Sequence, residues 1–436
     1  MTTTADGVRD LRPGRQRISL ALAVALTTPG LVLRLGHLSA GHAVDALIFG
    51  LAIVGAAFLL SWAAEVAQLD ISAGLAIAVL AFIAVLPEYA VDMVFAWKGG
   101  NAVEQFGPGC KAPGATGESP CSLALANMTG ANRLLIGIGW ALVVFIAWYQ
   151  WRRRRMPDRA VVLERSHSVE LSFLALACAY SLTLPLKSTI SLLDAVVLVG
   201  LFVVYTVRIS KAPAEEPHLV GPAAYVGSFT VKGRRIAFGL MFLFAAGVIV
   251  LCAEHFAEAL VSTGAEFGVS EFLLVQWLAP LASEAPELLI AGLYAWRLNT
   301  DAGLGTLVSS KVNQWTLLVG TLPIVFAIAS GSFGGLPIIA RQREELLLTA
   351  AQSVFAVAIM VDLSLSVKEA WALFSLFWAQ FLIGAVVPAS AHGAELVVVS
   401  VIYLVLAVAL LVRSRRSLPL LLRNGLRTSY AELSQQ

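Results

Sequence analysis

Two glutamates, each directly after a proline inside a long apolar segment, are the residues of this sequence best suited to chemistry. Glu88 lies in FIAVLPEYAVDMVFAW and Glu287 lies in LAPLASEAPELLIAGLYAW. A carboxylate at the depth of a bilayer costs about 2.5–3.5 kcal/mol to insert, so it indicates a functional site. The preceding proline removes a backbone donor, and we therefore expect the helix to break at each glutamate. Finding this pair twice predicts a duplicated transporter with one acidic site near the middle of the membrane.

The segment that follows each Pro-Glu helix carries polar side chains at its start. The first reads ANMTGANR over 126–133, and the second reads GTLVSSKVNQ over 305–314. Amide and hydroxyl oxygens are ligands that hard cations accept, and residues three or four apart share one face of a helix. The residues of the predicted cation- and proton-binding site are Glu88, Glu287, Asp92, Glu284, Asn127, Asn132, Ser310 and Gln314. Glu88 and Glu287 are the expected carboxylate ligands of a transported metal cation.

Two basic residues, Lys311 and Arg133, fall inside or beside these polar segments. A lysine about 4 Å from a carboxylate would compete with a bound cation by several kcal/mol at an effective dielectric constant of about 20. On one hypothesis, Lys311 gives up its proton when a cation binds and so couples cation to proton movement. The alternative is a set of fixed ion pairs that lock the site. These pairs would join Lys311 to Glu284 or Glu287, and Arg133 to Glu88 or Asp92.

Taken together, the four segments resemble the α-repeats of the cation/calcium exchanger superfamily, which includes the sodium/calcium and proton/calcium exchangers. The matching residues are Leu86, Pro87 and Glu88, then Asn127, Gly130 and Asn132, then Ala285, Pro286, Glu287 and Leu288, with Gly305, Ser310 and Gln314 in the corresponding places of the second half. The resemblance implies ten core helices, a central cation site with alternating access, and essential roles for Glu88 and Glu287.

The sequence also departs from the family pattern. The family has a glycine and a hydroxyl residue before each Pro-Glu, and this sequence lacks both. Two of the family's asparagines are replaced by other residues, and a basic residue follows another asparagine. The residues concerned are Ile83, Ala84, Val85, Ala282, Glu284, Thr306, Lys311 and Arg133. These departures leave open whether the cation is Na⁺ or Ca²⁺.

The composition predicts an all-α polytopic membrane protein. The 436 residues are 58% hydrophobic and 13% charged, whereas soluble domains carry about 25% charged residues. Apolar stretches of about 20 residues recur along the chain. The sequence lacks the nucleotide-binding pattern GxxxxGK[ST], and Glu254-His255 followed by Glu258 lacks the second histidine of a metalloprotease motif. We therefore expect no enzymatic activity, no cofactor, and inorganic cations and the lipid bilayer as partners, without nucleotide or nucleic acid.

Hydropathy predicts twelve spans, at about 18–36, 44–67, 71–97, 122–149, 168–185, 190–208, 235–262, 270–297, 303–330, 344–362, 368–389 and 394–412. Most arginines and lysines near the span ends fall on one side if both termini are cytoplasmic, and only Arg341 and Arg343 run against this rule. The expected location is a bacterial inner (plasma) membrane. Spans two to six and seven to eleven align as two inverted-topology repeats of five helices, each with its Pro-Glu segment second.

The predicted domains follow from this alignment. They are a basic N-terminus with an extra span (1–43), a first repeat (44–208), a cytoplasmic loop (209–234), a second repeat (235–389), and an extra span with a basic tail (390–436). An external loop at about 98–121 holds Cys110 and Cys121, which either form a disulfide or remain two free thiols. Cys178 and Cys252 lie within spans and are expected in the core.

Further polar residues within the spans leave two interpretations open. Glu65, Glu254 and Glu258 either line the cation path or lie at the interface, and His255 is either a proton relay or a packing residue. The function that the sequence favours is secondary antiport of Na⁺ or Ca²⁺ for H⁺ by alternating access at a midplane acidic site. The alternative is a non-transporting or altered-substrate homologue whose site is locked by internal salt bridges.

Overall fold

The structure is a computed structural model that describes residues 13–70, 86–114, 117–157, 160–212, 219, 221–388 and 391–433. Helices dominate these residues. The main helices are α1 (Pro13–Gly36), α2 (His42–Ala67), α4 (Leu86–Phe106), α5 (Pro120–Leu134), α6 (Ala141–Arg153), α7 (Ser168–Ser181), α8 (Leu192–Ile209), α9 (Gly221–Gly227), α10 (Val231–Phe267), α11 (Glu271–Trp296), α12 (Thr300–Asn313), α13 (Val319–Ser330), α14 (Ala340–Ile359), α15 (Val367–Val386), α16 (His392–Arg413), α17 (Ser417–Leu426) and α18 (Tyr430–Leu433).

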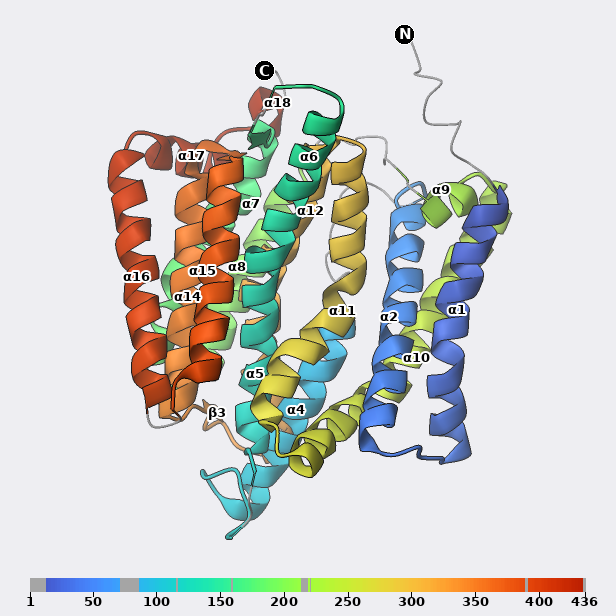
Figure 1. The fold of residues 1–436 in the computed structure, drawn as a ribbon, viewed down its shortest axis with the longest axis vertical. Coiled ribbons are helices and arrows are strands. Elements are labelled where there is room, and N and C mark those ends of the chain that lie inside the picture. The colour runs from blue at the N-terminus through green and yellow to red at the C-terminus, as the bar shows by residue number, and fades with distance from the viewer. Residues whose placement is uncertain are drawn as a thin grey trace.

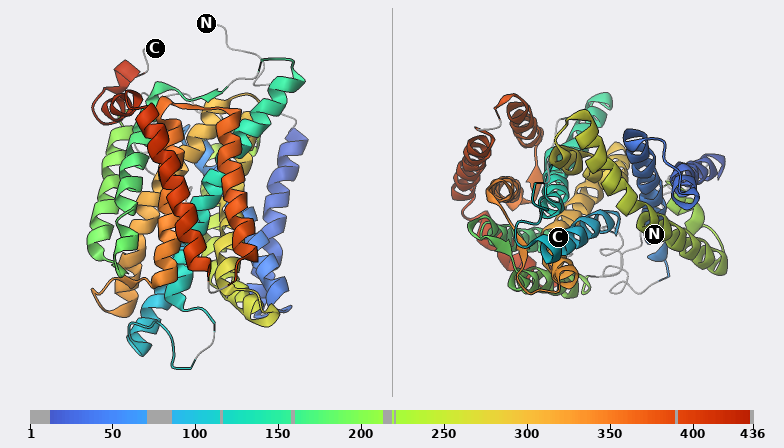
Figure 2. Two further views of the ribbon diagram at one scale, coloured as in Figure 1. Left: turned by 60° about the vertical axis from the view of Figure 1, so that its left-hand side comes forward. Right: turned by 90° about the horizontal axis from the view of Figure 1, so that it is seen from below.

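The helices form one bundle in which three groups can be distinguished. α1, α2 and α10 pack together on one side with the short helix α9, and α7, α8, α14, α15 and α16 lie on the other (Figure 1). α4, α5 and α11 lie between the two groups and contact each other. The view from below in Figure 2 shows α1 and α2 at one edge of the molecule and α16 at the opposite edge. Most of the predicted site residues lie on these central helices, and Ser310, Lys311 and Gln314 lie on α12 and the segment that follows it.

Each of the twelve predicted spans contains a helix within the described residues. Nine helical segments there are long and apolar enough to cross a membrane. The remaining predicted spans correspond to α4, α11 and α15, and α4 is described only from Leu86, so most of the predicted start of that span (71–85) lies outside the described residues. The all-α membrane fold is therefore confirmed.

The external loop is shorter than predicted, because α4 continues to Phe106 instead of ending near residue 97. Gly99 and Gly100, which resemble loop residues in the sequence, are places where other helices approach closely. A Cβ on Gly100 would lie 2.5 Å from Cβ of Ala329, and one on Gly99 would lie 3.3 Å from Sγ of Cys121. Only glycine allows this approach without displacing a neighbour. Cys110 in the remaining loop forms a disulfide with Cys121 in the first turn of α5, while Cys178 and Cys252 are free and buried as expected.

Two short strand pairs show the inverted relation of the repeats. β1 (Val161–Val162) pairs antiparallel with β4 (Ser364–Leu365), and β2 (Thr189–Ile190) pairs antiparallel with β3 (Leu336–Pro337). In each pair, one strand follows the third helical span of its repeat and the other follows the fourth span of the other repeat. β3 lies at the end of the bundle where the α4–α5 connection is found, away from the start of α1 and from α17 (Figure 1).

The prediction that the helix breaks at the second Pro-Glu pair is wrong, since α11 runs through both Pro280 and Pro286. A proline leaves the carbonyl four residues earlier without its helical donor, which neighbouring helices can tolerate. For Pro280 this is the carbonyl of Gln276, which lies so close to α5 that a Cβ on Gly130 would be 1.7 Å from its oxygen. α11 bends along its length and does not stop (Figure 1). Pro87 likewise lies within α4, and the residues before Leu86 are outside the description.

The helices are distorted one span later. α5 passes into α6 through a π-helical segment, η1 (Leu135–Trp140), and α12 passes into α13 through another, η4 (Gln314–Leu318). These segments begin three residues after Asn132 and Lys311, which are equivalent positions of the two repeats. π-helical turns often mark functional sites, and here they end the two polar segments predicted to face the carboxylates.

Candidate cation site

The centre of the site is the amide of Gln314, which binds carboxylates from two helices. Its Nε2 donates to Oε1 of Glu88 on α4 at 3.4 Å and also to Oε1 of Glu284 on α11. Glu88 and Glu284 are 3% and 2% exposed, and Gln314 is fully buried. Two carboxylates from different repeats thus converge on one nitrogen inside the protein. The sequence analysis paired Glu88 with Glu287, whereas the residue of α11 in this contact is Glu284.

A second carboxylate–amide pair lies one turn further along α4. Asn127 Nδ2 on α5 donates to Oδ1 of Asp92 at 2.7 Å, and both side chains are fully buried. Four residues separate Asp92 from Glu88, so both project from the same face of α4. The predicted contact of the acidic stripe of α4 with the polar start of α5 is therefore present.

Several oxygens of the site are buried and accept no hydrogen bond from any residue that the structure describes. They are Oδ2 of Asp92, Oδ1 of Asn127, Oε2 of Glu284, Oε2 of Glu287 and Oε1 of Gln314. Buried polar atoms are normally satisfied, so such a group calls for an explanation. Carboxylate and amide oxygens are also the atoms that Na⁺ and Ca²⁺ prefer. The donor set therefore fits a hard cation, although no cluster of three His, Cys, Asp or Glu side chains has metal-site geometry among the described residues.

Glu287 and Ser310 belong to the edge of this centre. Glu287 is buried on α11, 9% exposed, one turn from Glu284. Ser310 on α12 is 6% exposed, and among the described residues it makes no hydrogen bond to a carboxylate of the site. The structure therefore brings Glu88, Glu284 and Gln314 into direct contact. Glu287 lies one turn from Glu284 on α11, and Ser310 lies one turn before Gln314.

Lys311 does not form the ion pair considered from the sequence. Its buried amine donates to the backbone oxygen of Asn132 and, at 2.7 Å, to Oδ1 of the same residue. No Asp or Glu oxygen lies within 4.0 Å of this amine among the described residues. The lysine therefore occupies two oxygens of an asparagine that was expected to be a cation ligand, and it acts on the carboxylates only through space.

Arg133 also has a partner other than the predicted ones. Its Nη2 lies 2.9 Å from Oε2 of Glu345 on α14, and its guanidinium stacks over Trp277 with 5.3 Å to the ring centroid. Gln276 Nε2 on α11 donates to the same Glu345 oxygen at 3.1 Å and to Oγ1 of Thr129 at 3.3 Å. The predicted pairing of Arg133 with Glu88 or Asp92 is wrong because this buried cluster already holds the guanidinium.

The sequence analysis did not identify Glu345 and Gln276 as members of a site. One sequence feature could have identified them: each is a polar side chain inside a segment that hydropathy predicts to span the bilayer. Such side chains rarely occur there without a polar partner. The other polar residues considered lie elsewhere. Glu254 and Glu258 are about half exposed and lie 4.0 Å and 2.6 Å from Nζ of Lys98, and His255 packs edge-on against Phe49 with ring centroids 5.5 Å apart.

Comparisons with known proteins identify the family and the fold. The sequence matches the family described as sodium/calcium exchanger protein over residues 43–211 and 237–386. A solved structure of an H⁺/Ca²⁺ exchanger, CAX, is 42% identical, with 96% of this chain and 99% of that chain covered and a TM-score of 0.85. A Ca²⁺/H⁺ antiporter, YfkE, shares the fold at 16% identity, 89% and 99% coverage and a TM-score of 0.56. A search of curated proteins gave no match.

Proposed function

Because this chain belongs to the sodium/calcium exchanger family, we propose that it is a secondary antiporter that exchanges Ca²⁺ or Na⁺ for protons. Family and structural relatives are cation exchangers in membranes, so cation antiport by an integral membrane protein is the supported activity. The relative of 42% identity is an H⁺/Ca²⁺ exchanger, which favours Ca²⁺ over Na⁺ as the cation. The observation that supports the proposal most directly is the convergence of Glu88 and Glu284 on Gln314.

The buried acidic pair explains how one site would serve two cargoes. Two ionised carboxylates repel each other strongly in an apolar interior, and a buried charge without compensation is costly. Glu88 and Glu284 are therefore stable when either a metal cation or protons neutralise them. Because the same oxygens would hold both cargoes, binding of one displaces the other, which is the requirement for exchange. Glu287 would then supply a further oxygen at the edge.

Lys311 would set the charge of the site. Its amine binds two oxygens of Asn132, and its positive charge acts on Glu88 and Glu284 from beyond ion-pair distance. A fixed positive charge beside the acidic pair reduces the number of cations that the pair can hold. The competing function is a homologue whose site is locked by internal salt bridges. Among the described residues, neither Lys311 nor Arg133 forms the ion pair with a site carboxylate that this function requires.

Alternating access would come from α2 and α10. These helices pack against each other and against α1, and they cover the side of the central helices away from α14 and α16 (Figure 1). Movement of this group past α4 and α11 would open the site to one side of the membrane and then the other. We place the site at the bilayer midplane and both termini in the cytoplasm of a bacterium.

Flux into everted membrane vesicles tests the proposal. Uptake of Ca²⁺, Na⁺ and K⁺ would be measured under an imposed pH gradient for the wild type, Glu88→Gln and Glu284→Gln. We expect Ca²⁺ or Na⁺ uptake in the wild type and a loss of at least tenfold in both variants. Glu104→Gln, an exposed residue on the same helix as Glu88, is the matched control. Absence of pH-driven uptake of any of the three ions would refute antiport.

Lys311→Asn separates the two roles considered for the lysine. Removing a positive charge near the acidic pair should raise the apparent affinity for Ca²⁺ by about tenfold. This corresponds to about 1.4 kcal/mol of removed charge repulsion between the lysine and the bound cation. The measurement is the Ca²⁺ concentration that gives half-maximal exchange. If transport appears only in this variant, then the lysine blocks the wild-type site and the non-transporting alternative is correct.

A further inference from the structure

A cavity of about 290 Å³ lies apart from the acidic site, between α1, α2 and α9 on one wall and α11 on the other. It is found near the end of the bundle where α1 begins and α11 ends (Figure 1). The residues that line it are Arg15, Gln16, Ser19, Phe58, Trp62, Gly221, Pro222, Leu289, Ile290, Leu293 and Arg297. None of the residues of the acidic site is among them.

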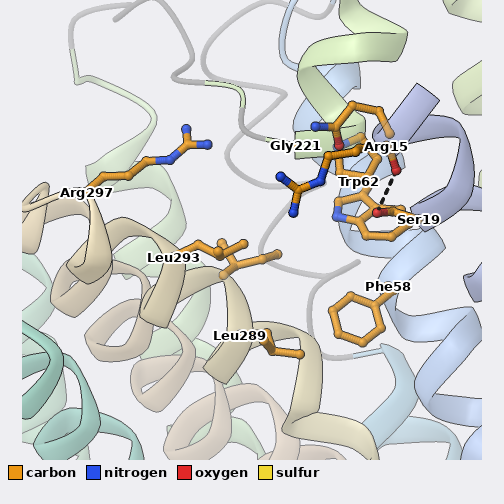
Figure 3. Close-up of a pocket in the computed structure, with 11 residues that line it drawn as sticks. Arg15, Ser19, Phe58, Trp62, Gly221, Leu289, Leu293 and Arg297 are labelled. Carbon is orange, nitrogen blue, oxygen red and sulfur yellow. Dashed lines mark hydrogen bonds between the residues drawn. The ribbon is translucent and has the colours of Figure 1, made fainter. Parts of the chain in front are cut away.

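Two arginines contribute positive charge to the lining of this cavity. Arg15 and Arg297 reach toward the same space from opposite walls (Figure 3). Neither guanidinium has an ion pair or hydrogen bond with another described residue. The neighbouring Arg17, in contrast, donates from Nε to the hydroxyl of Tyr225 at 2.8 Å. Planar guanidinium groups match phosphate and carboxylate oxygens, so the pair is suited to an anion.

The walls below the arginines are apolar. Leu289, Leu293 and Arg297 follow each other at four-residue steps along α11, which separates them by about 6 Å per step. Phe58 and Trp62 form the same kind of step on α2. Figure 3 shows Phe58 and Leu289 at the far end of the cavity from the two arginines. The cavity thus changes from basic to apolar over about 12 Å.

We propose that this cavity binds an anionic phospholipid, with the phosphodiester between Arg15 and Arg297 and the start of the acyl chains along Phe58, Leu289 and Leu293. The arginines lie where the helices end, which is the level of lipid headgroups. Leu289 and Leu293 are 53% and 44% exposed, and this apolar surface suits acyl chains rather than a free phosphate ion. The bound lipid would connect α1 and α2 to α11, the helix that carries Glu284.

The test uses purified full-length protein, stripped of native lipid in a neutral detergent, and native mass spectrometry. The probes are short-chain phosphatidylglycerol, the matching phosphatidylcholine, and glycerol 3-phosphate. We expect phosphatidylglycerol to bind more tightly than the other two. Arg15→Gln and Arg297→Gln should each weaken it by about fivefold, the value of one basic residue at an anionic membrane surface. Arg415→Gln, an exposed arginine outside the cavity, should leave binding unchanged.

Three results would overturn the inference. Equal binding of phosphatidylcholine would remove the role of charge, and wild-type affinity in the double variant would place the lipid elsewhere. Glycerol 3-phosphate binding as tightly as phosphatidylglycerol would assign the cavity to a free phosphate ester. Arg15→Lys and Arg297→Lys keep the charge and should retain most of the affinity, which separates loss of binding from loss of folding. Ion flux is not measured, so the outcome is independent of the proposed antiport.

Discussion

At the scale of single residues, Gln314 has a role that its type alone does not indicate. Its position at the start of the π-helical segment η4 turns its amide toward α4 and α11. An amide can donate to one carboxylate and still offer its own oxygen to a cation. Oε1 of Gln314 is one of the buried oxygens that accept no hydrogen bond within the described part of the chain. This residue therefore holds the two carboxylates together and also belongs to the set of oxygens that we propose for the cation.

Gly130 is a residue where one added methyl group should disrupt the site. A Cβ there would lie 1.7 Å from the backbone oxygen of Gln276, and the backbone atom cannot swing aside as a flexible side chain would. Gly130→Ala should therefore push α5 away from α11 and reduce both folded yield and thermal stability, with a fall in Tm of about 10 °C or more. The measurement is a thermal melt of the purified protein in detergent.

The control for this prediction is Gly200→Ala in α8. Nothing lies within 4 Å of a Cβ built on Gly200, and alanine is favoured over glycine in a helix by about 1 kcal/mol. Its melt should match or exceed that of the wild type. A normal melt for Gly130→Ala would show that α5 and α11 are further apart than the structure places them.

Residue spacing was enough to predict part of the site and not the rest. Glu88 with Asp92, and Glu284 with Glu287, share helix faces because of their spacing, and this could be read directly. The partner of Arg133 could not be read, because Glu345 is brought to it only by the packing of α14 against α5. Lys311 could equally have faced a carboxylate or an amide, since both lie within reach of a long side chain.

At the scale of elements, the buried cluster of Arg133, Glu345 and Gln276 joins α5, α14 and α11. Arg133 is 1% exposed and Glu345 is 6% exposed. Removing one partner of a buried ion pair leaves an uncompensated charge and costs about 3–5 kcal/mol. The cluster follows Asn132 directly, so it fixes the part of α5 that Lys311 contacts.

A double-mutant cycle should reveal this link between helices. We expect Arg133→Met and Glu345→Met each to lower the free energy of unfolding by about 3 kcal/mol, and the double variant to lose clearly less than the sum. Unfolding would be followed by far-UV circular dichroism in mixed micelles. The exposed pair Lys98–Glu258 is the control, with an expected coupling below about 1 kcal/mol. Additive losses at Arg133 and Glu345 would contradict a direct pair.

A second contact between elements lies just beyond α2. Arg234 donates to both carboxylate oxygens of Asp70, at 2.7 and 3.0 Å, and Arg235 donates to one of them at 3.0 Å. The hydrogen bond from Arg234 holds the pKa of Asp70 below its ordinary value. A carboxylate with a lowered pKa in the folded state stabilises that state above its unfolded pKa, and the effect is lost as the pH falls through the folded pKa.

This contact predicts an acid-sensitive link between α2 and α10. Asp70→Asn should melt a few degrees below the wild type at neutral pH, because a bidentate pair near the surface contributes modestly. The difference should persist down to about pH 4 and vanish at lower pH, where the wild-type carboxylate is protonated. Melts from pH 7 to pH 2.5 measure it, with Glu104→Gln as the control. A difference in melting temperature that stays constant across this pH range would show that the charge of Asp70 contributes nothing to stability.

The course of individual helices was predicted less well than their existence. Hydropathy located the spans because twenty apolar residues are needed to cross a bilayer, yet α10 exceeds its predicted range (235–262) at both ends, reaching from Val231 to Phe267. Continuation of α11 through Pro286 depends on neighbours that can accommodate its freed carbonyl. The π-helical segments η1 and η4 have no sequence signal that we recognised, because they arise where one helix packs against several others.

At the scale of the whole molecule, the two repeats meet in a reciprocal way. Both strand pairs join a connection of the first repeat to a connection of the second. The central contacts repeat this pattern, since α4 and α5 of the first repeat pack against α13 and α11 of the second. A site built from equivalent helices in opposite orientation can be exposed to either side by related motions, so the symmetry of the fold supports the proposed mechanism.

The same arrangement predicts which surfaces face each side of the membrane. α17 and the start of α1 lie at one end of the bundle, and the disulfide-bonded α4–α5 connection lies at the other (Figure 1). Arginines follow α16 at the first end, which the positive-inside rule assigns to the cytoplasm. A disulfide at the second end suits an oxidising exterior. The native cysteines should not react with thiol reagents, since two are bonded to each other and two are buried. Single cysteines can therefore be introduced into the wild-type sequence as labelling sites.

Glu104→Cys, on the exposed end of α4, and Arg415→Cys, just after α16, report on the two ends. A membrane-impermeant maleimide should label Glu104→Cys in intact cells and Arg415→Cys only in everted vesicles, and the wild type should remain unlabelled in both. The opposite pattern would reverse the assigned orientation while keeping the fold. Labelling of both reporters from the same side would contradict the separation of the two ends, because the chain would then have to cross the membrane an even number of times between residues 104 and 415.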